Sequence, residues 1–149
     1  MTRVRIVGDD DYDIRHELLS SATSSQALAT YEFLETPIEN AVELETATLG
    51  SALSLLNDLD WYLTRYADWV EVLEPSVSDD EWLSRDLATR LYERDLEPEE
   101  TRGFYAVRGV KDGESLEPLY TRGSPSEYDL DETDFEVVTR ISEDEFGEG

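Results

Sequence analysis

The stretch TATLGSALSLLNDLDWYLTRYADWVEVLEP, residues 46–75, decides the fold of this chain. Apolar residues recur in it every three or four positions, a spacing typical of a helix with one buried face. These residues are Leu49, Ala52, Leu53, Leu56, Leu59, Leu63, Tyr66 and Ala67. Residues 69–73 then change to β-branched and aromatic types, and Pro75 ends the run. The stretch therefore predicts one long helix followed directly by one strand.

The residues before this stretch predict the rest of an α+β unit. Residues 3–7 alternate charged and apolar side chains, which is typical of a strand with one buried face. A helix is expected over residues 14–28, and the serine and threonine cluster at residues 20–25 favours a break in it. Residues 31–35 and 41–45 predict two further strands. The resulting order, βαββαβ, is that of the ferredoxin-like fold.

This topology places the first strand beside both the third and the fourth. Arg3 and Arg5 would then lie across from Glu43 and Glu45, with Glu71 near them, on the open face of the sheet. Opposite charges on paired strands stabilise the pairing. We therefore expect these arginines and glutamates to form ion pairs between the strands.

The residues after Pro75 predict a helix. Ser78 followed three residues later by Glu81 has the spacing of a capping box, in which Ser78 is the N-cap. Val77, just before the cap, can pack against Trp82 in the first turn. The expected helix begins after Ser78 and runs to about residue 94, where its apolar stripe ends.

A β-hairpin and a last strand are expected after this helix. Residues 104–110 and 116–122 flank a short polar turn, and Pro118 places the second strand at a sheet edge. Residues 123–134 are expected to form a loop. Residues 135–141 predict the last strand because β-branched and aromatic residues dominate them.

These elements predict an α+β fold, specifically a two-layer sandwich. A chain of 149 residues is long enough for one hydrophobic core. We expect a single domain over residues 1–141. It would consist of a ferredoxin-like βαββαβ core at residues 1–75 and a C-terminal helix and β-hairpin extension at residues 76–141. Residues 142–149 are expected to form a frayed acidic tail.

Acidic residues dominate the composition. The chain holds 37 aspartates and glutamates against 12 lysines and arginines, which gives a net charge of −25, and Lys111 is the only lysine. The acid is spread along the whole chain, which favours adaptation to molar salt, where surface carboxylates keep a protein hydrated. The alternative is an acidic partner for a basic protein. Either way, the sign of the charge argues against nucleic-acid binding.

Several classes of protein are disfavoured by what the sequence lacks. The chain has no cysteine, which excludes disulfides, thiolate metal sites and cysteine nucleophiles. No apolar run is long enough to span a membrane, and the first residues lack the pattern of a signal peptide. Glycine-rich phosphate loops are also absent. We therefore expect a cytoplasmic protein without a cofactor and without a membrane partner.

Three segments carry a resemblance to a known family: VRIVGDDDYDIRHELL, TATLGSALSLLNDLDWYLTRYADWVEVLEPSVS and DDEWLSRDLA. They resemble an uncharacterised haloarchaeal family that is known only as a domain of unknown function. The resemblance covers roughly the first two-thirds of the chain. It implies a halophilic protein but no activity, so it assigns no functional residue.

The aspartates after the first strand are candidate metal ligands. Asp9, Asp11 and Asp13 have the first spacings of a calcium-binding EF-hand loop, but Ile14 stands where that loop requires glycine. The alternative is a solvated acidic turn that caps the following helix. His16 is the only histidine, and no nucleophile motif accompanies it, so a surface position is the more favoured reading.

Two features predict a protein-interaction surface. Trp61 falls on the polar side of the long helix, so it must contact a neighbouring part of the chain or a partner. Residues 101–125 hold four cations and three anions, a net charge of +1, which leaves −26 for all other residues. A halophilic protein leaves a surface non-acidic where that surface is covered. The candidate partner-binding residues are Trp61, Phe104, Tyr105, Arg108, Tyr120 and Arg122.

These features favour a non-enzymatic protein-binding or regulatory module whose partner is another protein or a second copy of itself. The alternative function is a small metal-dependent hydrolase or phosphotransfer protein that uses the carboxylates of residues 9–13. A third possibility is a small-molecule sensor, which would need a dimer and a lined cleft.

Overall fold

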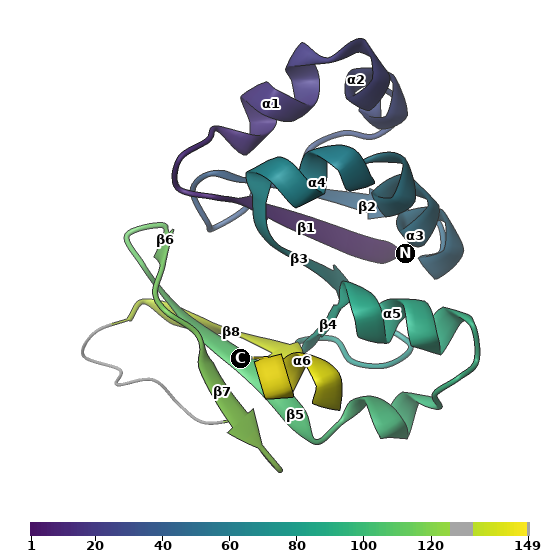
Figure 1. Ribbon diagram of the computed structural model, residues 1–149, viewed down its shortest axis with the longest axis vertical. Helices are drawn as coiled ribbons and strands as arrows, with labels where there is room; N and C mark the ends of the chain where they lie inside the picture. Colours follow the sequence, from purple (N-terminus) through teal and green to yellow (C-terminus); the bar gives the residue numbers. More distant parts are fainter. Residues whose placement is uncertain (126–132, 149) are drawn as a thin grey trace. The chain divides into compact units, whose positions relative to one another are not determined.

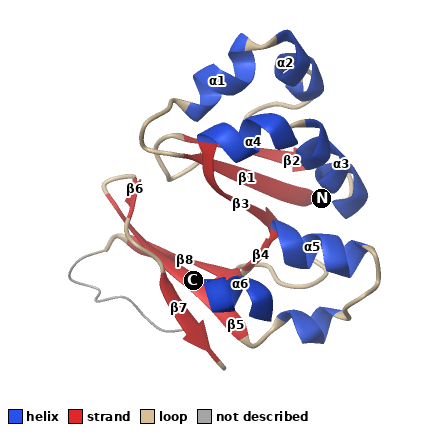
Figure 2. Cartoon of the chain, viewed as in Figure 1, coloured by secondary structure: helices blue, strands red, loops and turns tan. Residues whose placement is uncertain are grey.

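The computed structural model describes residues 1–125 and 133–148, and the chain divides into two compact units, Met1–Val72 and Leu73–Gly149 (Figure 1). Within the described residues there are six α-helices, one short 3₁₀ helix and eight strands (Figure 2). Most strand pairs are antiparallel. The predicted α+β fold is confirmed, whereas a single domain over residues 1–141 stays a prediction.

Three strands form the sheet of the first unit, in the order β2-β1-β3. They are β1 (Thr2–Gly8), β2 (Ala41–Thr46) and β3 (Ala67–Leu73), the last of which ends one residue past the unit. The first strand is central, as predicted. Strands β1 and β2 are antiparallel, and Arg5 lies directly opposite Glu43. The buried residues of β1 include Val4 and Ile6, which the alternating pattern predicted.

The predicted strand at residues 31–35 is wrong, because this segment has no regular secondary structure. Its one backbone bond to β2 runs from the amide of Leu34 to the carbonyl of Glu43, at 2.7 Å, and one such bond does not make a ladder. Phe33 instead lies beneath the guanidinium of Arg15, 5.0 Å from its ring centre. The ferredoxin-like arrangement is therefore not confirmed.

The first predicted helix breaks at the serine cluster, as expected. Helix α1 (Ile14–Ser20) ends before Ser21, and α2 (Ala22–Leu28) begins after it. Ser24 donates a side-chain hydrogen bond to the carbonyl of Leu18 at the end of α1. Serine side chains bond backbone groups in this way in competition with the helix ladder, which explains why the helix ends here.

The long helix predicted from the opening stretch is present but divided at Leu59. It consists of α3 (Leu49–Asp58) and α4 (Asp60–Tyr66). Thr48 caps α3 through a hydrogen bond from the amide of Ser51, at 3.1 Å. Figure 1 shows the helices of this unit on one side of its strands. The fully buried residues of the unit include Ile6, Ile14, Leu18, Leu44, Leu56 and Leu59.

The second unit holds a sheet in the order β4-β8-β5, with β6 and β7 both paired to the other side of β5. The pair β4–β8 is parallel. The elements are β4 (Trp82–Ser84), α5 (Arg85–Tyr92), the 3₁₀ helix η1 (Pro98–Thr101), β5 (Phe104–Lys111), β6 (Glu114–Ser115), β7 (Leu119–Arg122), β8 (Phe135–Arg140) and α6 (Glu143–Glu148). The predicted hairpin and last strand are confirmed, and the loop predicted at residues 123–134 lies partly outside the described residues.

The predicted helix start at Ser78 is wrong. Ser78 Oγ does accept the amides of Asp80 and Glu81, at 3.3 and 3.0 Å, but these bonds close an exposed turn. Trp82 and Leu83 then belong to β4 and pair with β8. The local spacing is that of a cap, but pairing with a distant strand overrides it. The helix begins instead after Ser84, whose Oγ accepts the amide of Leu87 at 3.2 Å.

Replacing Ser84 by alanine is expected to destabilise the protein by about 1 kcal/mol, because α5 loses its N-cap. The same hydroxyl donates to Glu145 Oε1 at 2.6 Å, so the variant also loses this contact with α6. Ser78→Ala is the matched control, since Ser78 caps only an exposed turn, and it should cost less. Chemical denaturation at one fixed KCl concentration measures both. A larger loss for Ser78→Ala would show that the helix begins at Ser78 in solution.

The predicted frayed tail is also wrong, because α6 forms within it. Ser142 and Glu145 make a capping box: Ser142 Oγ accepts the amide of Glu145 at 3.1 Å, and Glu145 Oε1 accepts the amide of Ser142 at 2.8 Å. Arg90 of α5 bonds Asp144 at 3.2 Å, and this hydrogen bond, with the nearby Asp86, raises the pKa of Arg90. Helix α6 is therefore held to the second unit by several polar contacts.

Candidate functional site

The hairpin strands β5 and β7 place three of the predicted partner-binding residues on one face. The strands are antiparallel, with Phe104 directly opposite Arg122 and Ala106 directly opposite Tyr120. Because residues directly opposite each other share a face of the sheet, Phe104, Tyr120 and Arg122 lie on the same side. The guanidinium of Arg122 lies 5.5 Å from the ring centre of Phe104.

The structure does not bring the remaining hairpin candidates to this surface in the same way. Tyr105 is only 4 % exposed and belongs to the core of the second unit. Arg108 is half-buried and already has an interaction of its own. Phe104 is half-buried and contacts Phe146 of α6, with 5.1 Å between ring centres. Tyr120, at 41 % exposed, and Arg122 are the candidates that remain open to solvent.

Strand β7 is the edge of the hairpin. Among the described residues it pairs with β5 alone. The amide of Gly123 donates to the carbonyl of Gly103 at 2.7 Å, so in the alternating ladder residues 119, 121 and 123 turn their backbone groups toward β5. Tyr120 and Arg122 therefore turn their N–H and C=O groups outward. Leu119 and Tyr120 are exposed large side chains on this edge.

Pro118 divides the second hairpin strand into β6 and β7. The amide of Leu116 bonds the carbonyl of Gly109, whereas Leu119 lies opposite Val107, so the register shifts by one residue between them. One strand therefore carries an extra residue, which is a β-bulge. A short strand that begins after a proline is a common protection of sheet edges. The protected part ends at Leu119, beyond which the edge is regular.

Trp61 of α4 is a second exposed aromatic group, in the first unit. It is 53 % exposed, and the guanidinium of Arg65 lies 3.8 Å from its ring centre. Tyr62 and Tyr66 contact it edge-on, with ring centres 5.0 and 6.4 Å away. These contacts come from its own helix, so the tryptophan remains open on its outer side. Arg65 covers one face of the ring in a cation–π contact.

The aspartate loop after β1 is fixed by backbone hydrogen bonds. The Oδ1 atom of Asp9 accepts the amide of Asp11 at 2.9 Å, and that of Asp13 accepts the amide of His16 at 3.1 Å, which caps α1. Asn40 closes the loop from the other side. Its side chain donates to the carbonyls of Asp9 and Tyr12 and accepts the amide of Ile14, at 2.8–3.0 Å.

The loop does not gather its carboxylates. Over residues 1–125 and 133–148, no three His, Asp or Glu side chains come close enough to hold a metal ion. Asp9 and Asp13 use their carboxylates to order the turn and the helix start, as the capping alternative predicts. The geometry therefore gives no support to the metal site at Asp9, Asp11 and Asp13 or to the hydrolase that would depend on it.

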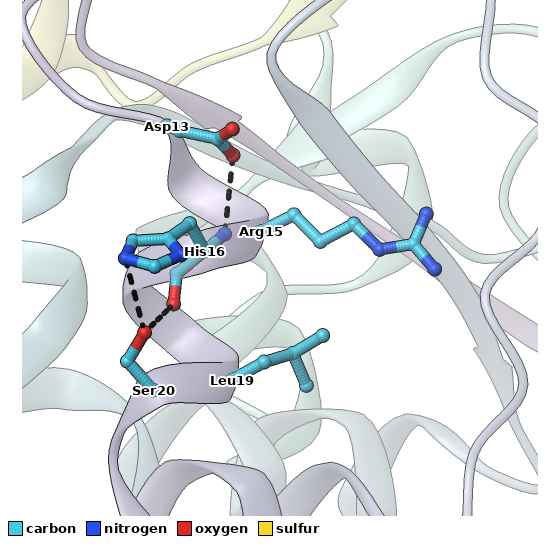
Figure 3. A pocket seen from close by; sticks show the side chains of 5 residues that line it. All are labelled: Asp13, Arg15, His16, Leu19 and Ser20. Carbon is cyan, nitrogen blue, oxygen red and sulfur yellow. Dashed lines mark hydrogen bonds between the residues drawn. The ribbon is translucent and has the colours of Figure 1, made fainter.

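A shallow hollow of about 380 Å³ lies over α1 and is lined by Asp13, Arg15, His16, Leu19 and Ser20 (Figure 3). His16 Nε2 lies 3.3 Å from Ser20 Oγ, which is a serine–histidine pair. The serine hydroxyl, however, donates to the carbonyl of His16 at 2.6 Å. Asp13 bonds the amide of His16 and not its ring. The three residues therefore make ordinary helix contacts in solvent, and this is not the geometry of a catalytic triad.

A buried cluster of charges joins the three strands of the first unit. Arg5 Nε donates to Glu43 Oε1 and Arg5 Nη1 donates to Glu71 Oε1, both at 2.8 Å. Arg3 adds bonds to Glu43 at 3.3 Å and to Glu45 at 2.9 Å. The predicted pairs are therefore present, but Arg5, Glu43 and Glu71 are buried and not on an open face. The cluster holds the strands together, and its central groups, Arg5, Glu43 and Glu71, are not accessible to solvent.

The comparisons with known proteins place the chain in one family. The profile of the family of unknown function DUF5804 matches residues 2–110. The chain belongs to DUF5804. No curated protein and no solved structure matches it. The predicted family of unknown function is thus confirmed, and its haloarchaeal source stays a prediction.

The DUF5804 match divides the hairpin. It includes Phe104, Tyr105 and Arg108 and ends one residue before the end of β5, so Tyr120 and Arg122 lie beyond it. The exposed edge is therefore outside the part of the chain that defines the family. Sequence reasoning also missed Asn40. Its type allows the left-handed backbone that it adopts, with φ 53°, but nothing local shows that its side chain reaches residues 26 to 31 positions away.

None of the helices in the described residues is both long and apolar enough to cross a membrane.

Proposed function

We propose that this chain is a non-enzymatic protein-binding module, in the sense of a regulatory or scaffolding domain, that docks a strand of its partner on the edge of β7. The observation that supports this proposal is the outward-facing backbone of Tyr120 and Arg122 on an exposed strand. An extended peptide that adds to such an edge gains main-chain hydrogen bonds, and alternate side chains give specificity. Leu119 and Tyr120 supply exposed apolar surface at the same place.

The charge of the chain supports the same location. Residues 101–125 carry a net charge of +1, whereas the remaining residues carry −26. We propose a cytoplasmic protein adapted to molar salt, because the acid is spread evenly and lysine is nearly absent. In such a protein the hairpin is the stretch where a partner meets the least negative charge. The ferredoxin-like description of the first unit belongs to the same proposal and rests on its strand order.

Tyr120→Pro is expected to abolish co-purification of the partner in molar KCl while the protein stays folded. Proline lacks the amide hydrogen that Tyr120 turns outward, and proline is tolerated at edge positions of this kind. The β5–β7 ladder uses residues 119, 121 and 123, so its bonds are kept. Arg122→Glu is a second variant with the same expected result, because it reverses the charge of the edge.

Tyr92→Ala is the matched control, because Tyr92 is an exposed tyrosine of the same unit that lies on α5. Each variant is checked by a melting curve beside the pull-down. If folded Tyr120→Pro and Arg122→Glu both retain the partner, β7 is not the docking edge. If the control loses the partner too, binding depends on α5, and the proposal is again contradicted.

A further inference from the structure

We propose that the strand that docks on β7 is β7 of a second copy of this chain, in an antiparallel pair with Thr121 on the two-fold axis. This inference rests on the proposed function and adds the identity of the partner and the register of the pairing. A two-fold axis makes the contact isologous, so the same edge must complement itself. The sequence of the edge shows in which register it does so.

Pro118 decides the register. The outward backbone positions of β7 are Tyr120 and Arg122, and Pro118, which lies at the bulge before the strand, has no amide hydrogen. If Tyr120 paired with itself, Arg122 would lie opposite Pro118, and its carbonyl would receive no hydrogen bond. If Tyr120 pairs with Arg122 of the second copy, both residues donate and accept. The two-fold axis repeats this pair, which gives four main-chain hydrogen bonds.

The side chains of this register are complementary. Tyr120 of each copy lies directly opposite Arg122 of the other, on the same face of the joined sheet, where a guanidinium can stack on the tyrosine ring. Thr121 lies opposite Thr121 of the second copy. Its Oγ1 atom is buried and has no hydrogen-bond partner among the residues that the structure describes. Two threonine hydroxyls opposite each other can bond one another once each side chain turns toward the joined edge, which would satisfy this group.

Concentrated salt allows two copies of this acidic chain to associate. Two chains of net charge −25 repel each other, and a contact through the hairpin adds the least to this repulsion. At molar ionic strength the screening length is about 3 Å, so the repulsion between the remaining surfaces is removed. We therefore expect a dimer in molar KCl that dissociates when the salt is diluted.

Cysteine cross-linking tests the register directly, because the chain has no cysteine of its own. Across the axis, the two Thr121 residues form a non-hydrogen-bonded pair with Cα atoms about 4.5 Å apart. This lies within the range that a disulfide bridges, up to about 7 Å. Thr121→Cys is expected to give a covalent dimer under mild oxidation in molar KCl, and a reducing agent should return it to the monomer.

Leu119→Cys is the matched control. In the proposed register the two Leu119 residues are four positions apart along the strands, about 14 Å, which is too far for a disulfide. This variant should therefore remain a monomer after oxidation. Equal cross-linking of both variants would reflect random collision and would overturn the register, and absence of cross-linking in Thr121→Cys would do the same.

Sedimentation equilibrium in molar KCl tests the association without a cross-link. The unmodified protein should have twice the monomer mass of 17.0 kDa, and Tyr120→Pro should have the monomer mass. A monomeric parent protein overturns the inference of a second copy. If a different protein then co-purifies in a Tyr120-dependent way, the proposed function stands. A dimer that persists in Tyr120→Pro overturns the inference, since the copies then meet elsewhere.

Discussion

Arg5→Ala is expected to destabilise the protein by roughly 3–5 kcal/mol, the usual cost of removing one partner from a buried ion pair. Arg5 bonds both Glu43 and Glu71 at 2.8 Å, and Glu71 is 0 % exposed. Without the guanidinium, two carboxylates remain buried on β2 and β3, the strands on either side of β1. Each of them then loses a charged hydrogen-bond donor at 2.8 Å, and burial keeps water from replacing it.

Arg3→Ala is the matched control for this variant. Arg3 lies on the same strand and bonds Glu43 and Glu45, but its side chain is 40 % exposed. Exposed ion pairs contribute about 1 kcal/mol or less, so this variant should be close to the parent protein. Chemical denaturation in fixed molar KCl compares the free energies of unfolding. Equal losses for Arg3→Ala and Arg5→Ala would show that the cluster is solvated in solution.

Gly8→Ala is expected to cost about 1–3 kcal/mol, because the added methyl group overpacks a closed site. A Cβ atom at residue 8 would lie 2.6 Å from Asn40 Nδ2 and 2.8 Å from Ile14 Cβ. Asn40 cannot turn away without losing its bonds to the carbonyls of Asp9 and Tyr12 and to the amide of Ile14. Ile14 is fully buried and begins α1, so it cannot yield either.

Gly147→Ala is the control for the loss of glycine as such. An added Cβ at residue 147 meets nothing within 4 Å, and the residue lies in α6. Alanine is favoured over glycine in a helix by up to about 1 kcal/mol, so this variant should be neutral or more stable. Melting curves in molar KCl compare the two. A neutral Gly8→Ala would mean that the loop from Asp9 to Asp13 does not depend on the Asn40 contacts.

Local sequence patterns, such as alternating side chains and the serine cluster, predicted several elements of the structure. The alternation in β1 predicted the burial of Val4 and Ile6, and the opposite charges on the other face predicted the pairing of Arg5 with Glu43, although that face is buried as well. The serine cluster gave the break at Ser21, since its hydroxyls bond nearby backbone groups in any context. In these places the local preference and the tertiary structure agree, so the sequence alone is sufficient.

Contacts between distant residues could not be predicted in this way. The capping spacing after Ser78 is real, but Trp82 and Leu83 pair with Thr139 and Arg140, more than fifty positions later. No local pattern shows that pairing. The helix at the end of the chain is a different case, because Ser142 and Glu145 have the capping-box spacing and the signal was present. The strong acidity of residues 142–149 favoured a frayed tail in spite of that signal.

Only part of the candidate site could be predicted, because the rest also depends on contacts between distant residues. Proline at residue 118 indicated an edge strand, and the structure places Tyr120 and Arg122 on that edge. The alternating pattern could not tell which of Phe104 and Tyr105 faces the core, because both are aromatic. In the structure Tyr105 is buried, whereas Phe104, on the other face of β5, is half-buried. The outward backbone groups of β7 follow only from the register.

The position of β8 has a consequence for how the second unit is made on the ribosome. β8 lies between β4 and β5 in the sheet, yet both of those strands precede it in the chain. Until residues 135–140 have left the exit tunnel, β4 and β5 have no strand between them, and the edges that later pair with β8 stay unpaired. The strands of the first unit, by contrast, are all complete by residue 73. Since chains grow from the N-terminus, the first unit can fold during translation while the sheet of the second must wait until residue 140 has emerged.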